Sequence, residues 1–241
     1  MENRIREELV SYSEAEKREI LPRFFKTGPG EYGEGDCFLG VTVPNTRLVA
    51  KRYKTAGLEV IASLLQSSWH ECRLCALLML VERFKKTNDA ERQAIYLFYL
   101  SQTPRINNWD LVDLSAPYIV GEYMLTHDRK DLYRLADSTC LWEQRIAIVA
   151  TLTLIRHGDF TDILALAEKL LTHRHDLIQK AIGWMLREMG KRDKELLVQF
   201  LEKFGLSMPR TMLRYAIEKF PEEERQYFLK KKQKLKGTTG N

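Results

Sequence analysis

Two residues in the stretch INNWDLVDLSA, residues 106–116, could do chemistry together: Trp109 and Asp113. The surrounding sequence has a helical pattern, in which residues four apart lie one turn apart on one face. When the N-glycosidic bond of a nucleotide breaks, positive charge develops on the deoxyribose. A fixed carboxylate stabilises that charge and orients the attacking water. We therefore consider Asp113 a candidate catalytic residue, with Trp109 beside it.

Two residues further along the chain suit the same chemistry. Arg145 could hold a flanking phosphate in a bidentate contact. Trp184 follows Lys180 by one turn and could share the groove. Aromatic faces attract a cationic base by about 0.5–2 kcal/mol. If the base is N-alkylated and already cationic, its departure needs no general acid, so one carboxylate is enough.

The same residues also have a structural interpretation. Asn107 or Asn108 is a good N-cap for the helix, and an acidic residue in the first turn complements the helix dipole. We therefore interpret Asp110 as structural. Trp109 and Trp184 could also be core residues, as most tryptophans largely are.

Almost the whole chain has the pattern of helices separated by short turns, which makes successive helices antiparallel neighbours. The first amphipathic stretch is interrupted near Pro22. The one non-helical segment, residues 26–47, holds five of the thirteen glycines and predicts a long ordered loop or a small hairpin near residues 27–43. The helices are expected at residues 3–26, 57–66, 69–86, 89–101, 108–126, 130–137, 141–157, 160–172, 175–190, 193–204 and 208–219.

A repeat is visible in five of these helices, each of which places a polar residue ahead of an apolar run. The aligned residues are Arg73, Asp113, Arg145, Lys180 and Arg214. Their spacing, about 35 residues with two helices per unit, is typical of a HEAT-like α-solenoid. The run from Ile146 to Ile155 fits an inner helix packed on several sides. We expect one all-α solenoid domain with a concave face over residues 1–229, and a basic, flexible tail over residues 230–241.

Four of the five aligned positions are basic and lie early in their helices, where the macrodipole disfavours a cation by about 0.3–1 kcal/mol. This choice favours an anionic ligand, such as a polyanion, on the concave side. The alternative is that these cations are paired with nearby Glu and Asp. Asp113 occupies the one aligned slot without a cation. On a surface that holds phosphate, a carboxylate should serve a particular purpose.

Composition sets the remaining bounds. Net charge is +5, and the five lysines of KKKQKLK at residues 230–236 account for it, so net charge is weak evidence for a nucleic-acid partner. No apolar run approaches a membrane span, and the N-terminus lacks an apolar signal core. Four cysteines suit a reducing compartment. Cys72 and Cys75 form a CxxC, but without a second pair we expect small apolar residues rather than a metal site.

Several motifs resemble the AlkD-like DNA alkylation repair family over roughly residues 20–220. They are FLGVTVPNTR, NNWDLVD, LWEQRIAI and IQKAIGWMLRE, in the family's order. The resemblance implies a HEAT-like DNA glycosylase that removes cationic N3- and N7-alkylated purines from double-stranded DNA and leaves an abasic site. It implies no metal and no organic cofactor. It also implies action without taking a flipped base into a deep pocket, unlike most glycosylases.

The resemblance implies roles for residues of this chain. Asp113 would be the catalytic carboxylate, Trp109 and Trp184 would contact the lesion nucleotide's backbone and sugar, and Arg145 would contact phosphate. We expect a monomer that acts at the bacterial nucleoid in the cytoplasm, without membrane contact. The residues expected to bind DNA are Arg47, Lys51, Arg73, Lys180, Arg187 and Arg214.

The segment TGPGEYGEGD, residues 27–36, departs from the family pattern as an insertion. Related branches carry a hairpin and resemble binders of branched DNA, and a Gly-rich hairpin could probe DNA shape. Three hypotheses therefore stand: an alkylpurine DNA glycosylase, a structure-selective DNA-binding protein, and a protein-interaction solenoid.

Overall fold

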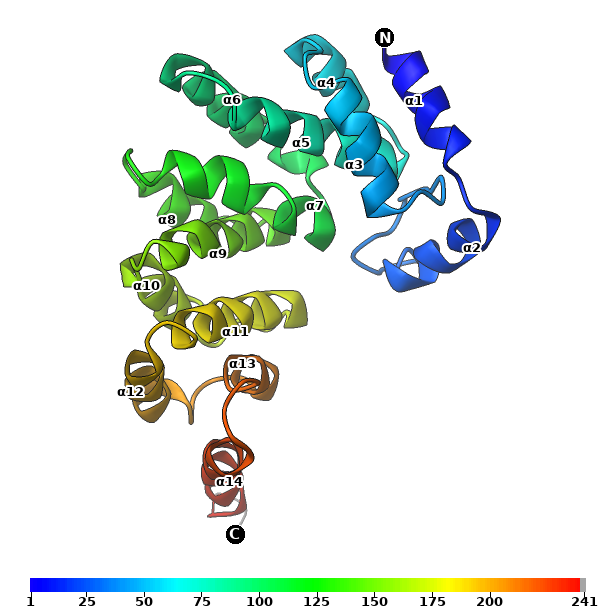
Figure 1. Cartoon of the computed structure of the whole chain (residues 1–241). Coiled ribbons are helices and arrows are strands. Elements are labelled where there is room, and N and C mark those ends of the chain that lie inside the picture. Colours follow the sequence, from blue (N-terminus) through cyan, green and yellow to red (C-terminus); the bar gives the residue numbers. More distant parts are fainter. Residues whose placement is uncertain (239–241) are drawn as a thin grey trace. The chain divides into compact units, whose positions relative to one another are not determined.

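The structure is a computed structural model that describes the backbone of residues 1–238 and the side chains of residues 1–231. The described residues form helices and contain no strand (Figure 1). One isolated bridge joins Cys37 to Trp69. The predicted all-α fold is therefore confirmed. The chain divides into two compact units, Met1–Tyr123 and Met124–Asn241, which are described separately.

The first unit is built around one buried helix, α5. Every side chain from His70 to Val81 is buried, and α5 packs against α1, α3, α4, α6 and α7. Each fully buried Leu or Met there contributes roughly 1.5–3 kcal/mol. The elements are α1 (Glu2–Ser11), α2 (Ala15–Phe24), α3 (Val43–Arg52), α4 (Leu58–Leu65), α5 (His70–Phe84), α6 (Asp89–Ser101), the 3₁₀ turn η1 (Thr103–Arg105), α7 (Trp109–Asp113) and the π-helical turn η2 (Pro117–Gly121).

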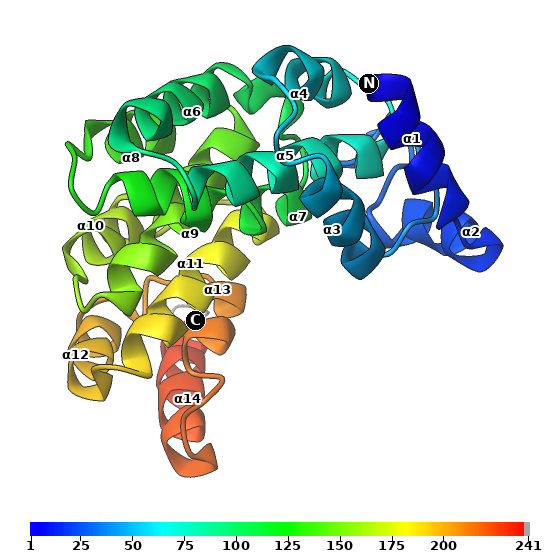
Figure 2. The same cartoon turned by 45° about the horizontal axis from the view of Figure 1, so that its top comes forward.

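The second unit has the packing of a helical repeat, as predicted. Helix α9 packs against α8 and α11, and α11 packs against α13, while α10 and α12 lie on one side of this row (Figures 1 and 2). All side chains from Arg145 to Ile155 are buried, which confirms an inner helix. The elements are α8 (Lys130–Ala136), α9 (Leu141–Arg156), α10 (Thr161–Lys169), α11 (Asp176–Gly190), α12 (Lys194–Phe204), α13 (Arg210–Ala216) and α14 (Glu222–Thr238).

A glycine allows two helices of this row to approach closely. A Cβ on Gly183 of α11 would lie 2.5 Å from the Met212 carbonyl oxygen of α13, closer than side-chain carbons approach. The glycine therefore sets the α11–α13 spacing, at a helix-interior cost of about 1 kcal/mol relative to alanine.

The interruption of the first helical stretch was predicted near Pro22, and this position was wrong. Pro22 lies inside α2, and the break comes at residues 12–14. There the Glu14 N–H donates to the Gly40 carbonyl at 2.9 Å. This contact, at the break between α1 and α2, joins residues far apart in sequence, so the local pattern could not reveal it.

The end of the non-helical segment was also wrong: it was predicted at residue 47, but α3 begins at Val43. Pro44, inside the predicted non-helical segment, occupies the first turn of α3, where proline is favoured because its missing N–H is not needed. Residues 26–42 form the predicted loop, held by turns, and no hairpin occurs among the described residues.

The predicted helix over residues 108–126 is broken into shorter pieces. Helix α7 ends at Asp113, and the π-helical turn begins at Pro117. A proline has no N–H for the carbonyl four residues earlier, which here is that of Asp113. The proline therefore explains why this helix stops at the candidate catalytic residue.

The predicted tail at residues 230–241 begins inside α14, which runs from Glu222 to Thr238. Residues 239–241 and the side chains from residue 232 onward lie outside the described residues. The single domain over residues 1–229 stays a prediction. Among the described helices, none combines the length and apolarity required to cross a membrane.

Candidate active site

The candidate catalytic residues lie at the two ends of α7. Asn108 caps this helix, since its Oδ1 accepts the Trp109 N–H at 2.8 Å; Asn108 was one of the two predicted caps. Trp109 is the first residue of the helix and Asp113 the last, and both side chains are half-buried. The predicted spacing of one helical turn is thus present.

Two aromatic rings, from the last residue of α2 and the residue after it, hold the Trp109 side chain. Its ring stacks on Phe25 with centroids 5.3 Å apart and planes 20° apart. Phe24 meets it edge-on at 5.7 Å. Such pairs contribute about 0.5–1.5 kcal/mol beyond their buried area. The indole beside Asp113 therefore has a fixed position.

Trp109 and Asp113 line a cavity of about 380 Å³ in the first unit. Its volume is within the range of small-molecule sites. Most of the wall is apolar and aromatic. The lining residues are Lys17, Leu21, Phe24, Phe25, Phe38, Val41, Thr42, Val43, His70, Glu71, Leu74, Trp109, Asp110, Asp113 and Leu114.

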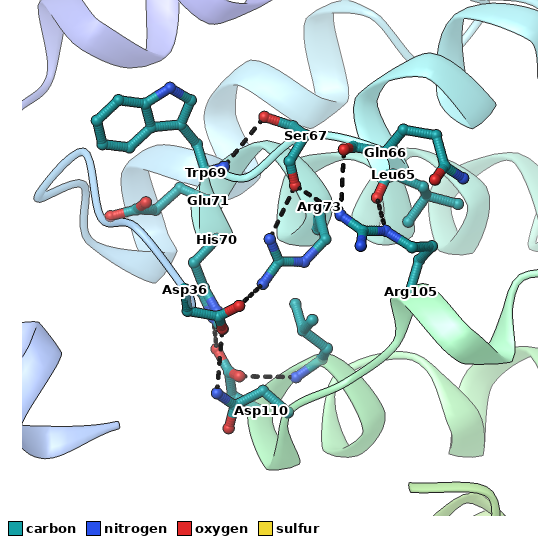
Figure 3. A network of polar contacts seen from close by, with 12 residues as sticks. Asp36, Leu65, Gln66, Ser67, Trp69, His70, Glu71, Arg73, Arg105 and Asp110 are labelled. Atoms are coloured by element: carbon teal, nitrogen blue, oxygen red, sulfur yellow. Dashed lines mark hydrogen bonds and ion pairs between the residues drawn. The ribbon is translucent and has the colours of Figure 1, made fainter. Parts of the chain in front are cut away.

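A buried polar network fixes the start of α7 (Figure 3). His70 of α5 lies between two carboxylates, with Nε2 2.8 Å from Asp110 Oδ2 and Nδ1 3.1 Å from Asp36 Oδ2. Although burial lowers its pKa, the charge and hydrogen bond of Asp110 and the hydrogen bond of Asp36 raise the pKa of His70 to about 9. The ring is therefore a cation at neutral pH and donates from both nitrogens.

The same network holds the end of the Gly-rich segment. Arg73 Nη2 donates to Asp36 Oδ1 at 2.6 Å, and Arg73 Nη1 donates to the Ser67 carbonyl at 2.9 Å. Burial raises the pKa of Asp36, but the hydrogen bond from His70 and the charge of Arg73 lower it further, so the net shift is downward. Asp110 has the predicted structural role, since its Oδ1 also accepts the Leu111 N–H at 2.9 Å.

Glu71 anchors the loop that follows Asp36. Its carboxylate accepts the backbone N–H groups of Leu39, Gly40 and Val41 at 2.9, 2.9 and 3.1 Å. Gly40 has φ 82°, and a Cβ there would lie 2.6 Å from the Glu14 carbonyl oxygen. The first turn of α5 thus holds two segments: its Glu71 side chain binds the loop, and its His70 side chain binds the start of α7.

Sequence reasoning missed Asp36, His70 and Glu71 as functional supports. The available signal was the three acidic or basic residues in HECR, residues 70–73, at the start of a helix that is otherwise apolar. Buried charges require partners, so such a run indicates a polar network. The partners themselves lie 30–40 residues away and are not visible in the local pattern.

The second unit contains the other two predicted catalytic residues. Arg145 of α9 is buried, and its Nη1 donates to the Leu177 carbonyl at 2.7 Å. Trp184 is half-buried on α11, on the same face as Lys180 and Arg187. The roles of Arg145 and Trp184 in catalysis stay predictions.

The residues predicted to bind DNA occupy different environments. Arg47 and Lys51 lie four residues apart on α3; Arg47 is half-buried and Lys51 is exposed. No described carboxylate forms an ion pair with either residue. Arg214 is exposed on α13. Arg73 is only 1% exposed, so its guanidinium is occupied by protein partners.

Some of the aligned cations fit the alternative of pairing with acidic residues. Among the aligned cations, Lys180 Nζ lies 2.7 Å from Asp176 Oδ2. Arg187, predicted to bind DNA but outside the aligned row, pairs with Glu218. With Arg73 and Arg145 buried, the row does not present four exposed cations. DNA binding by these residues stays a prediction.

The CxxC cysteines are packed inside α5. Cys72 and Cys75 are buried, and burial raises the pKa of the Cys72 thiol to about 11 and that of Cys75 further. Both thiols are therefore protonated at neutral pH. In the part of the chain described, no three His, Cys, Asp or Glu side chains are grouped to hold a metal ion.

Comparisons with known proteins agree with the sequence motifs. The family model described as "DNA alkylation repair enzyme" matches residues 5–220. A solved structure, "Predicted DNA alkylation repair enzyme from Enterococcus faecalis", is similar with a TM-score of 0.69 and 18% identity, over 87% of this chain and 97% of that one. This likeness supports the fold. A search of curated proteins found no match. On the family match, the chain belongs to the DNA alkylation repair enzyme family.

Proposed function

We propose that the protein is a DNA glycosylase that removes cationic N3- and N7-alkylated purines from duplex DNA by hydrolysis of the N-glycosidic bond. The observation that carries the proposal is the position of Asp113: a half-buried carboxylate that ends α7, one turn from Trp109, at the same cavity. Membership of a family of DNA repair enzymes supports an enzymatic role on DNA.

The reaction requires little acid–base chemistry. The bond between the purine nitrogen and C1′ breaks, and its electron pair neutralises the alkylated base, which leaves as a neutral molecule. The oxygen of water then bonds to C1′, and the proton it loses passes to Asp113 or to solvent. The carboxylate of Asp113 stabilises the cationic sugar meanwhile, an effect that typically changes rate by about 10²–10³ per group.

Trp109 has a positioning role in this proposal. Its indole is held by Phe24 and Phe25, so its face is fixed without the substrate. An aromatic face attracts a cation. A fixed indole one turn from the carboxylate therefore favours the alkylated nucleotide over its neutral counterpart.

We assign contacts with DNA phosphates to basic residues in each unit. In the first unit we assign Arg47 and Lys51, which share one face of α3. In the second we assign Lys180, Arg187 and Arg214. The predicted catalytic roles of Arg145, which is buried, and of Trp184 are kept as predictions. We assign Arg73 a structural role, because it is buried against Asp36.

Release of 7-methylguanine from methylated duplex DNA tests the proposal directly. If the affinity for DNA rises steeply as the salt concentration falls but no base is released, the protein is a DNA-binding protein on this scaffold. A protein that does neither would be an interaction solenoid. The variant that identifies the catalytic group is Asp113→Asn.

A further inference from the structure

Helix α7, which carries both Trp109 and Asp113, is too short to hold its own position. It spans five residues, and an isolated helix of this length is unstable in water. Leu111 and Val112 are buried and anchor its middle, but the burial of apolar surface has no preferred direction. The rotation of α7 about its axis is therefore set by directional contacts from other elements.

One directional contact at the start of α7 comes from His70 of α5 (Figure 3). The imidazole, a cation at neutral pH, has its Nε2 2.8 Å from Asp110 Oδ2, and both side chains are buried. A hydrogen bond between charged groups is short and depends strongly on direction. Asp113 follows Asp110 by three residues and lies beside it on the helix surface. The bond to His70 therefore also orients the candidate catalytic carboxylate.

A second connection runs from His70 to Trp109 through Phe25. The Phe25 ring lies against the imidazole, with centroids 4.8 Å apart, and against the indole, with centroids 5.3 Å apart. Phe38 stacks on both the imidazole and Phe25, at 4.8 and 5.1 Å. Aromatic faces attract a cation that they contact, and both phenyl rings are buried. His70 therefore fixes the ring on which the indole of Trp109 stacks.

His70 is itself held by the Gly-rich segment. Its Nδ1 lies 3.1 Å from Asp36 Oδ2, and Arg73 donates to the other oxygen of Asp36 at 2.6 Å. Asp36 Oδ2 also accepts the side-chain N–H of Asn108, the cap residue of α7, at 3.4 Å. The imidazole thus has a carboxylate at each ring nitrogen, Asp36 on one side and Asp110 on the other. It cannot turn without breaking one of these two contacts.

We propose that His70 is a positioning residue for base release. It fixes Trp109 through Phe25, and it orients Asp113 through Asp110, so that indole and carboxylate are aligned before DNA binds. The inference rests on the proposed function, in which Trp109 and Asp113 act on the lesion nucleotide. A displacement of about 1 Å at a catalytic group can cost roughly 100-fold in rate. Loss of His70 should therefore slow the chemical step and leave DNA affinity unchanged.

Single-turnover release of 7-methylguanine from methylated duplex DNA, at saturating protein, tests this role. We expect His70→Gln, which lacks the charge and the ring, to release the base about 10–100-fold more slowly than the wild type. Its DNA affinity, measured by fluorescence anisotropy, should stay within about 3-fold. Release at the wild-type rate at saturating protein would overturn the inference, whether or not the affinity falls.

Ile61→Ala is the control for lost stability. Ile61 is a fully buried residue of α4 that does not line the cavity, and its truncation destabilises the first unit by leaving a void. Its release rate should stay within about 2-fold of the wild type, at a temperature where urea unfolding shows every variant to be folded. A loss of rate as large as that of His70→Gln would attribute the effect to destabilisation and overturn the inference.

Phe25→Leu tests the aromatic connection and covers the case in which His70→Gln does not fold. It removes the ring that contacts both the imidazole and the indole, so release should again slow at unchanged DNA affinity. In the double variant the two losses should not multiply, because residues that act through one contact are coupled. The rate should be within about 3-fold of the slower single variant. Multiplied losses would show that His70 does not act through Phe25 and would overturn the inference.

The indole N–H signal of Trp109 in a two-dimensional NMR spectrum distinguishes this inference from the proposed function. The chain has four tryptophans, and Trp109→Phe identifies the signal. His70→Gln should shift or broaden it and leave the signals of Trp142 and Trp184 in place. If the wild type releases no base but the Trp109 signal depends on His70, the glycosylase proposal fails and the positioning of Trp109 stands. If base is released and neither signal nor rate depends on His70, the glycosylase proposal stands and this inference fails.

Discussion

His70 and Asp110 are joined by a buried contact of 2.8 Å between Nε2 and Oδ2. This contact links the start of α5 to the first turn of α7, three residues before Asp113. Asp36 binds the other ring nitrogen at 3.1 Å. A protonated imidazole between two carboxylates thus holds the Gly-rich segment and the candidate catalytic helix in one arrangement.

Stability should fall as pH rises because of His70. Its pKa is about 9 in the folded protein and about 6.5 when unfolded. A group whose pKa is raised by folding stabilises fully below its unfolded pKa, and this contribution is lost as pH rises to the folded pKa. We expect a loss of roughly 3 kcal/mol between about pH 6.5 and 9, measured by urea unfolding.

His70→Gln is the control for this pH dependence. The amide cannot titrate, so the variant should be less stable at pH 6 and should lose less stability up to pH 8. The comparison is made below the range where the buried Cys72 thiol contributes, because burial raises the pKa of that thiol as well. Parallel pH profiles of wild type and variant would show that His70 is not a buried cation.

Gly183→Ala should destabilise the second unit. In a helix interior the change to alanine ordinarily stabilises by about 1 kcal/mol. Here the added Cβ would lie 2.5 Å from the Met212 carbonyl oxygen, a backbone atom that cannot move away cheaply. We expect a net loss of about 1–3 kcal/mol in the free energy of unfolding, from overpacking. A stabilised variant would show that α11 and α13 are not packed this closely.

Arg47 and Lys51 should contribute to DNA binding through phosphate contacts. Replacing both with Gln should reduce the slope of log K against log salt by up to about 2, since each phosphate contact contributes roughly 0.9. Fluorescence anisotropy over a salt series measures the slope. Lys203→Gln is the control, because Lys203 is exposed on α12 and not assigned to DNA. An unchanged slope in the double variant would remove α3 from the DNA-binding surface.

The parts that could be predicted from sequence depend on local pattern. The apolar run of α9 and the repeat spacing predicted the helices of the second unit, and the four-residue spacing predicted Trp109 and Asp113 on one turn. Tertiary contacts decided the rest. The bond from Glu14 to Gly40 lies at the break between α1 and α2, and Pro44 lies in the first turn of a helix inside the segment predicted to be non-helical.

The candidate site shows the same limit. Arg73 was aligned with residues expected to face DNA, because sequence gives a position in the repeat but not the partner of a side chain. The guanidinium of Arg73 is buried, where it donates to Asp36, 37 residues earlier in the sequence. Asp113, by contrast, stays half-buried at a cavity, so its predicted role remains compatible with its surroundings.

Release of 7-methylguanine from methylated duplex DNA by the wild type and Asp113→Asn is the most direct test of the account. We expect release by the wild type, a rate at least about 100-fold lower for the variant, and DNA affinity within about 3-fold. Asp137→Asn, a surface carboxylate of the second unit, should behave like the wild type. Release by Asp113→Asn at the wild-type rate, or no release by the wild type, would contradict the account.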